Sequence, residues 1–358
     1  MAEEAGFDKM TDNPNELDPE HLAPWLEQHV PGFHDLREIR KFEGGQSNPT
    51  FMIHAESGNY VLRTQPPGEL LQSAHQVDRE YRVMKALAET GVPVPRVYAL
   101  SLKHEGPLSR MFFVMEFLDG HIFWDPVLPE LVGPDANERR AVVYDRMNDA
   151  LAKLHSVDIE AVGLGDFGKP GNYFERQTGR WSRQYVASEV DRYDDVHNLI
   201  SWLEANMPAD DGAISLVHGD FRLDNMVFSH DGKEILGILD WELSTLGHPL
   251  ADLAYQCMQW RLPHEGSFRG LGDLDRKSKD IPTEEEYVAA YCKRRDIDKP
   301  DNWTFYVAFC FFRLAAILQG VYKRSLDGNA SNPELAKLYG SRVPILASMA
   351  MEMIREKS

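Results

Sequence analysis

The stretch from Leu216 to Glu242, LVHGDFRLDNMVFSHDGKEILGILDWE, constrains this chain more than any other part of it. Asp220 follows a His-Gly pair, Asn225 comes five positions later, and Asp240 ends a short apolar run typical of a buried strand. A carboxylate can orient and deprotonate a hydroxyl group, while the oxygens of an Asn and a second Asp can hold Mg²⁺ on nucleotide phosphates. The pattern therefore predicts phosphoryl transfer, with Asp220 as catalytic base and with Asn225 and Asp240 as metal ligands.

Each of these residues also has a plainer interpretation. Asp220 and Asn225 could be polar turn residues, because Asp and Asn are common in turns. Asp240 could cap a helix instead of binding a metal. His218 could serve as a base, but a bracing role through hydrogen bonds in the loop is favoured. Arg222 could contact phosphate or substrate, or could form a salt bridge.

Composition narrows the classes of partner. The 358 residues are enough for one large or two modest domains. The net charge of 38 − 57 = −19 argues against binding to nucleic acid or to an anionic membrane, both of which use clustered Lys and Arg. Cys257, Cys292 and Cys310 lack metal-ligand spacing, and their odd number argues against a disulfide framework.

The N-terminus is acidic and lacks an apolar signal core, and no run of about 18 apolar residues is present. We therefore expect no membrane span and a cytoplasmic location. The sequence does not specify an oligomeric state.

The pattern of strands and helices predicts an α+β chain with a bilobal organisation. Residues 1–16 are expected to be disordered or flexible, 17–117 to form an N-terminal β-rich nucleotide-binding lobe with a leading helix, and 118–358 to form a C-terminal helical catalytic and substrate lobe. The small lobe should contain one helix over 73–89 beside its strands. The large lobe should contain long helices at 135–157, 181–206, 283–295, 301–325 and 333–355, with short strands at 214–217, 226–228 and 235–239.

A small-residue turn lies between two of the predicted strands of the small lobe. Small residues allow backbone N–H groups to approach phosphates, although hairpins use similar turns routinely. The candidate phosphate-binding residues in this turn are Gly44, Gly45, Gln46 and Ser47.

Two further elements of the small lobe carry candidate nucleotide-binding residues. Arg63 lies on the third strand, where a kinase carries a cation that contacts the phosphates and pairs with a helical Glu, here Glu80. The alternative is an exposed strand Arg and a solvated helical Glu. Met115, Glu116 and Leu118 end the last strand and would contact adenine if this segment is the inter-lobe hinge. Otherwise they form a buried strand end.

These residues together resemble the aminoglycoside phosphotransferase-like branch of the protein-kinase-like superfamily. The resemblance covers roughly Leu36 to Lys323, and its main motifs are LVHGDFRLDNMVF, GILDWELSTLGHPLADLAY and VMEFLDG. The segments GGQSNPTF and YVLRTQPPGELLQSAHQVDREYRVMKAL look closest to one subgroup. That subgroup comprises phosphotransferase domains found alone in bacteria or fused to acyl-CoA dehydrogenases.

The resemblance implies a bilobal protein-kinase-like fold and the use of ATP and Mg²⁺. It implies that Asp220 is the catalytic base and that Asn225 and Asp240 bind the metal. It also implies the Arg63–Glu80 ion pair, and Arg at position 63 is usual in this subgroup. It also implies that Asp252 supports the catalytic loop. The acceptor would be a hydroxyl group of a small metabolite, with a hydroxyacyl-CoA or a related compound as one candidate.

Other functions stay open at this point. The chain could be a non-catalytic nucleotide- or acyl-binding pseudokinase, although all three acidic and amide residues of the motif are present. An aminoglycoside-modifying kinase and a protein kinase are further alternatives, but the short gap from Asp240 to Pro249 leaves little room for an activation loop. Aromatic residues that could line an acceptor cleft, or simply form core, are Trp202, Tyr255, Trp260, Phe305 and Phe312.

Overall fold

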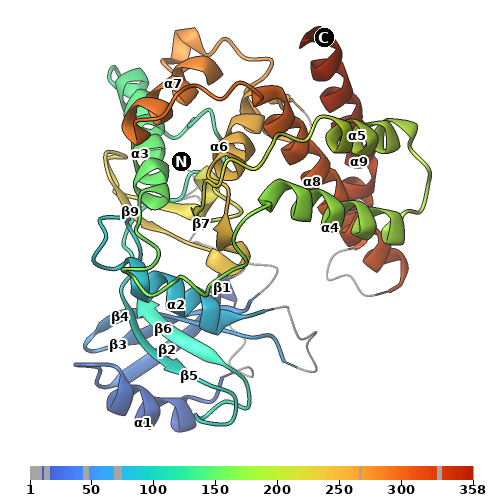
Figure 1. Cartoon of the computed structure of the whole chain (residues 1–358). Coiled ribbons are helices and arrows are strands. Elements are labelled where there is room, and N and C mark those ends of the chain that lie inside the picture. The colour runs from blue at the N-terminus through green and yellow to red at the C-terminus, as the bar shows by residue number, and fades with distance from the viewer. Residues whose placement is uncertain are drawn as a thin grey trace. The chain divides into compact units, whose positions relative to one another are not determined.

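The computed structural model describes residues 10–11, 17–42, 48–67, 75–265, 268–328 and 333–357 (Figure 1). The chain divides into two compact units, each made of three segments. Unit 1 comprises residues 1–165, 222–244 and 276–282. Unit 2 comprises residues 166–221, 245–275 and 283–358.

Unit 1 is built on a six-stranded antiparallel sheet with the strand order β1-β2-β3-β4-β6-β5. The strands are β1 (Met10–Thr11), β2 (Leu36–Phe42), β3 (Thr50–Ala55), β4 (Gly58–Thr64), β5 (Val97–Ser101) and β6 (Phe112–Glu116). The first of these lies within the segment that was expected to be flexible.

The two faces of this sheet are covered by two helices because side chains alternate along each strand. Helix α1 (Pro19–His29) begins at Asp18, whose side chain accepts the Glu20 amide, and packs its leucines into the cluster that contains Phe112 and Val114. Phe113 points to the other face, where its ring lies 6.2 Å from Tyr81 of helix α2 (Val77–Leu87). Figure 1 shows α1 and α2 on opposite sides of the sheet.

A distant segment of the chain completes unit 1. Strands β8 (Met226–Phe228) and β9 (Ile235–Ile238) form an antiparallel hairpin, and a short turn η3 (Trp241–Leu243) follows it. The hairpin packs against helix α3 (Ala136–His155) and pairs with residue 121 through a β-bridge, while η3 packs against α2. The division after residue 117 that the sequence suggested therefore falls inside unit 1.

Unit 2 is mainly helical. Its helices are α4 (Tyr173–Ser188), α5 (Asp194–Ala205), α6 (Leu250–Cys257), α7 (Glu284–Arg295), α8 (Trp303–Leu326) and α9 (Pro333–Lys357). Short strands β7 (Ser215–Val217) and β10 (Thr245–Gly247) form an antiparallel pair. Helix α8 packs against α4, α5, α6 and α9, and a cluster of aromatic rings around Phe174 joins α4 to α8.

Helix α8 is long and apolar enough to cross a membrane by length and composition, but 78% of its most apolar window is buried within the structure. A helix that is apolar on all sides and buried is typical of a protein core.

The secondary structure differs from the sequence expectation at two places. The single helix expected over 181–206 is two helices, because the chain becomes extended at Glu189 (φ −60°, ψ 126°). The carbonyl of Ser188 accepts a hydrogen bond from Gln319 of α8 (2.7 Å), which replaces the bond that another helical turn would supply. Helix α2 begins at Val77, after the non-helical residues 75 and 76, whereas residues 73 and 74 of the expected helix lie outside the described residues. The expected α+β composition, with a small antiparallel sheet and a mainly helical remainder, is confirmed.

Candidate active site

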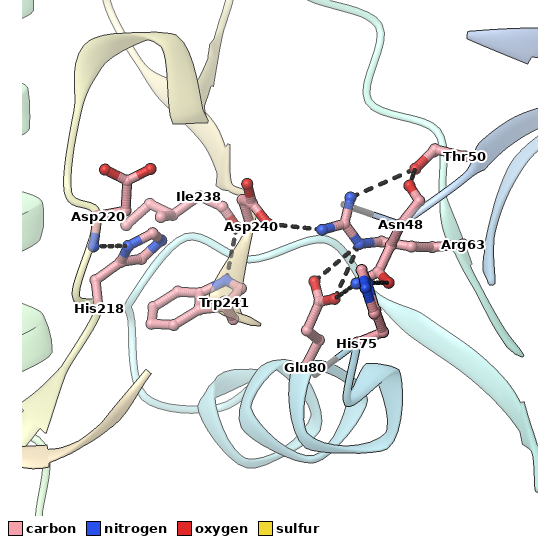
Figure 2. Close-up of polar contacts among 10 residues, drawn as sticks. All are labelled: Asn48, Thr50, Arg63, His75, Glu80, His218, Asp220, Ile238, Asp240 and Trp241. Atoms are coloured by element: carbon pink, nitrogen blue, oxygen red, sulfur yellow. Dashed lines mark hydrogen bonds and ion pairs between the residues drawn. The ribbon is translucent and has the colours of Figure 1, made fainter. Parts of the chain in front are cut away.

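Arg63 is the centre of the polar cluster in unit 1 (Figure 2). Leu62 belongs to the core under α1, so the next residue on β4 points to the opposite face, toward α2. The Nε atom of Arg63 donates to Glu80 (3.0 Å), one terminal nitrogen donates to Asp240 (2.6 Å), and the other lies 3.4 Å from the hydroxyl of Thr50. One guanidinium thus ties the sheet, helix α2 and the end of β9 together.

Glu80 is almost fully enclosed, with 1% of its surface exposed. Burial raises the pKa of Glu80 to about 7, against the opposing effect of the Arg63 charge. The side chain of Asn48 donates a further hydrogen bond to the Glu80 carboxyl group (3.0 Å), and Nδ1 of His75 lies 3.1 Å from the side-chain oxygen Oδ1 of Asn48. Burial alone would lower the pKa of Arg63, but Glu80 and Asp240 raise it, so the guanidinium stays charged.

Asp240 has a left-handed backbone conformation (φ 63°) at the point where β9 ends. It occupies the N-cap position of η3, but its side chain makes no capping hydrogen bond and instead forms the ion pair with Arg63. The Leu239 amide donates to the Asn225 carbonyl (2.8 Å), so the β8–β9 hairpin holds Asn225 beside the residue that precedes Asp240. The two predicted metal ligands are therefore brought together within unit 1.

Glu242 adds a third carboxylate to this cluster. Oxygens of Glu80, Asp240 and Glu242 all lie within 4.8 Å of one another. Arg63 forms ion pairs with two of these acids, Glu80 and Asp240. Asp240 is 34% exposed, so solvent or a ligand can reach its carboxylate. Arg222, whose role the sequence left open, forms an ion pair with Asp224 (2.8 Å).

Asp220 lies in unit 2, in a loop that begins at the end of β7. Asp252 of α6 is buried, and its two carboxylate oxygens accept the amides of His218 (2.6 Å) and Gly219 (2.9 Å). The Asp220 amide donates to Nδ1 of His218 (3.2 Å; Figure 2). The expected bracing by His218 and support by Asp252 are therefore both seen in the hydrogen bonds.

The Asp220 side chain has a hydrogen-bonding partner that the sequence did not indicate. Tyr255 of α6 donates its hydroxyl to Asp220 Oδ1 (2.7 Å). Arg313 of α8 donates to the carbonyl of Gly219 (2.6 Å), and its guanidinium lies 5.4 Å from the centre of the Tyr255 ring. The sequence indicates Tyr255 only as an aromatic residue that could line a cleft or form core. No local motif indicates Arg313, because it lies far from the Asp220 motif in the sequence.

The residues predicted to contact adenine lie in β6 and just beyond its end. Met115 is buried in β6, while Glu116 and Leu118 are half-buried at and beyond its end. The Glu116 amide donates to the Arg96 carbonyl (2.8 Å), so this amide is already used and is not available for the predicted contact with adenine. The residues Gly44, Gly45, Gln46 and Ser47 lie outside the described residues.

Comparison with known proteins gives the family. Residues 38–291 match the phosphotransferase enzyme family, known as APH. Acyl-CoA dehydrogenase family member 10 of Mus musculus is 46% identical over 316 residues, which are 88% of this chain and 29% of that protein. The chain spans between 29% and 46% of the length of the curated relatives that it matches.

Solved structures agree with this match. A candidate aminoglycoside phosphotransferase from Ralstonia eutropha JMP134 is 43% identical, with a TM-score of 0.85, and the match covers 95% of this chain and 98% of that one. Spectinomycin phosphotransferase in complex with ADP and spectinomycin shares the fold at 12% identity, with a TM-score of 0.61 over 93% of this chain and 97% of that one. The resemblance stated from the motifs is thereby confirmed: this chain belongs to the phosphotransferase enzyme family and has its protein-kinase-like fold.

Proposed function

We propose that the chain is an ATP- and Mg²⁺-dependent kinase that phosphorylates a hydroxyl group of a small metabolite, and that the metabolite is a hydroxyacyl-CoA. The observation that carries the proposal is the Arg63 cluster. Its guanidinium joins Glu80 to Asp240, and Asp240 lies at the end of a strand beside Asn225. Phosphoryl transfer needs a positioned cation for the phosphates and oxygen ligands for a metal, and this cluster supplies both.

The residues present fit Mg²⁺. Asp240, Asn225 and Glu242 offer carboxylate and amide oxygens, which are the ligands that hard divalent cations take. Oxygens of Glu80, Asp240 and Glu242 lie within 4.8 Å of one another, and a divalent cation at this place would offset part of their negative charge. Asn225 and Asp240 would hold the ion. When bound, Mg²⁺ neutralises charge on the nucleotide phosphates.

Each remaining role falls to a residue of this chain. Arg63 would contact phosphate oxygens through its guanidinium fork, with Glu80 fixing the direction of that fork. Asp220 would orient the acceptor hydroxyl and accept its proton as the phosphoryl group is transferred. The loop that carries Asp220 is held by two backbone hydrogen bonds to Asp252, which is the rigidity that a positioned base needs.

The choice of acceptor rests on the names of the relatives. Proteins named acyl-CoA dehydrogenases match this chain at 37–46% identity over most of its length. A domain related to one in such proteins would meet acyl-CoA compounds, and only those with a hydroxyl group offer an acceptor that Asp220 can deprotonate. This supports a hydroxyacyl-CoA over an antibiotic.

A nucleotide-consumption screen tests the proposal. The purified chain would be given ATP and Mg²⁺ with hydroxyacyl-CoAs, sugars, choline-like alcohols or aminoglycosides, and ADP release would be measured. We expect hydroxyacyl-CoAs to give the largest stimulation. If only another class of compound stimulates ADP release, the assignment of a hydroxyacyl-CoA as acceptor is wrong, but the assignment as a kinase stands.

The variant Asp220→Asn tests the assigned base. Turnover should fall by about 10²- to 10⁴-fold because the amide cannot accept the hydroxyl proton. Binding of Mg²⁺·ADP, measured by calorimetry, should be unchanged, because the cation and metal ligands assigned here lie elsewhere in the sequence. Asp194→Asn, at the exposed start of α5, is the matched control and should keep full turnover. Wild-type turnover in Asp220→Asn would show that another group is the base.

A further inference from the structure

We infer that Tyr255 and Arg313 act together as positioning residues that fix the carboxylate of Asp220. Their effect on turnover rests on the proposed kinase function, whereas their effect on the carboxylate itself does not. All of these residues lie within unit 2.

Helix α6 holds both the backbone and the side chain of the Asp220 loop. Asp252 accepts the amides of His218 and Gly219, and Tyr255 follows it by three residues, which places both side chains on one face of the helix. Tyr255 is buried, with 7% of its surface exposed, and its hydroxyl donates to Asp220 Oδ1 at 2.7 Å. A short bond from a rigid aromatic side chain restricts rotation of the carboxylate plane and favours its ionised form.

The guanidinium of Arg313 lies over the Tyr255 ring. Arg313 is 8% exposed, and its guanidinium lies 5.4 Å from the centre of the Tyr255 ring and 5.9 Å from that of Trp181. A cation over an aromatic face draws electron density from the ring, so the phenol becomes a stronger hydrogen-bond donor. Arg313 also donates to the Gly219 carbonyl at 2.6 Å, immediately before Asp220.

Among the residues that the structure describes, no carboxylate lies within 4.0 Å of the Arg313 guanidinium, whose contacts are one carbonyl and two rings. A buried charge is costly unless nearby groups compensate it. Burial would lower the pKa of Arg313, but Tyr173, Tyr255, Cys310 and Asp220 together raise it, so the guanidinium remains charged. The contacts of Arg313 with the Gly219 carbonyl and the Tyr255 ring give a reason for a buried cation at this position.

The test compares Tyr255→Phe with Tyr287→Phe in the full-length chain. The first variant removes only the hydroxyl bound to Asp220 and keeps the ring under Arg313. The second removes the buried hydroxyl of Tyr287, which donates to Gln256 (2.8 Å) in the same unit. It therefore controls for the loss of a buried hydrogen bond that does not involve the Asp220 loop. The Asp220 carboxyl carbon would be followed by NMR with ¹³C-labelled aspartate during acid titration, and its signal would be assigned with Asp220→Asn.

We expect the titration midpoint of Asp220 to move upward in Tyr255→Phe and to stay in place in Tyr287→Phe. An unchanged midpoint in Tyr255→Phe overturns the inference whatever the turnover. Arg313→Lys should move the midpoint in the same direction, and the double variant should shift it by less than the sum of the two single shifts, because both residues act on one carboxylate.

Turnover gives a separate reading. With ATP, Mg²⁺ and the best acceptor of the screen, kcat should fall about 10- to 100-fold in Tyr255→Phe, while the KM for ATP stays unchanged. Tyr287→Phe should keep the wild-type kcat. If the wild type turns over no acceptor, the proposed function fails, and the NMR titration still decides whether Tyr255 fixes Asp220.

Discussion

Arg63 shows how a single side chain can join elements that are far apart in the sequence. It lies on β4, its first partner Glu80 lies on α2, and its second partner Asp240 follows β9 some 177 positions later. The arginine fork suits this task because its nitrogens point in fixed directions, whereas a lysine would present one compact charge. The sequence predicted the Arg63–Glu80 pair, but the contact with Asp240 depends on the position of the hairpin and carries no local signal.

Replacing Arg63 should destabilise the protein strongly. Arg63→Met leaves Glu80 buried without its cation, which typically costs about 3–5 kcal/mol of unfolding free energy. Urea unfolding followed by circular dichroism measures this. Arg37→Met is the control on the same sheet, since its exposed pair with Glu56 contributes at most about 1 kcal/mol. Adding Glu80→Gln to Arg63→Met should recover part of the loss, and no recovery would argue against the buried charge as the cause.

At the scale of elements, the β8–β9 hairpin determines where the two proposed metal ligands lie. Its length and apolar residues were predictable from the sequence, and so was the position of Asp240 at its end. Which unit it joins was not predictable, because that depends on the bridge between residues 121 and 228 and on packing against α3. The break between α4 and α5 was missed for a similar reason, since the bond from Gln319 that ends α4 comes from a helix more than 100 residues away.

Close packing around the β8–β9 hairpin predicts that Gly237 is sensitive to substitution. A Cβ atom on Gly237 of β9 would lie 2.4 Å from Leu118 Cδ1 and 3.1 Å from Pro95 Cδ, so Gly237→Ala requires Leu118 to move and either Pro95 or the strand that carries Asp240 to shift slightly. We expect a loss of about 1–3 kcal/mol in unfolding free energy and weaker Mg²⁺-dependent binding of ADP. Gly179→Ala in α4 meets only the flexible end of Arg183, and it should be neutral or stabilising. Equal melting temperatures for the two variants would contradict the packing argument.

At the scale of the whole molecule, the family and the α+β fold could be predicted because the motifs are dense in polar residues with fixed spacing. The contacts that hold Asp220 could not be predicted in the same way. Tyr255 looks like an ordinary helical aromatic in the sequence, and Arg313 looks like a charge within an apolar helix. Their roles depend on the packing of α6 against α8, which brings together residues that are 58 positions apart in the chain.

The cysteines offer a measurement on one unit alone. Cys257, Cys292 and Cys310 all lie in unit 2 and are buried, and burial raises the pKa of each thiol. Alkylation by iodoacetamide at pH 8 should therefore be slow in the native protein, because the reacting thiolate is suppressed. Mass spectrometry should find three modified thiols after unfolding in urea. Rapid modification without denaturant would show that unit 2 opens far below the unfolding transition.

The discontinuous composition of unit 1 limits how this chain can be cut or joined. Residues 222–244 belong with the sheet, although they follow the first helices of unit 2 in the sequence. A gene truncated after residue 117 would encode Arg63 without Asp240, and the removed part would encode Asp240 without Arg63. Neither product would contain the complete Arg63 cluster. A natural fusion or a laboratory transplant that preserves the Arg63 cluster must therefore carry residues from the first strands through the hairpin as one uninterrupted reading frame.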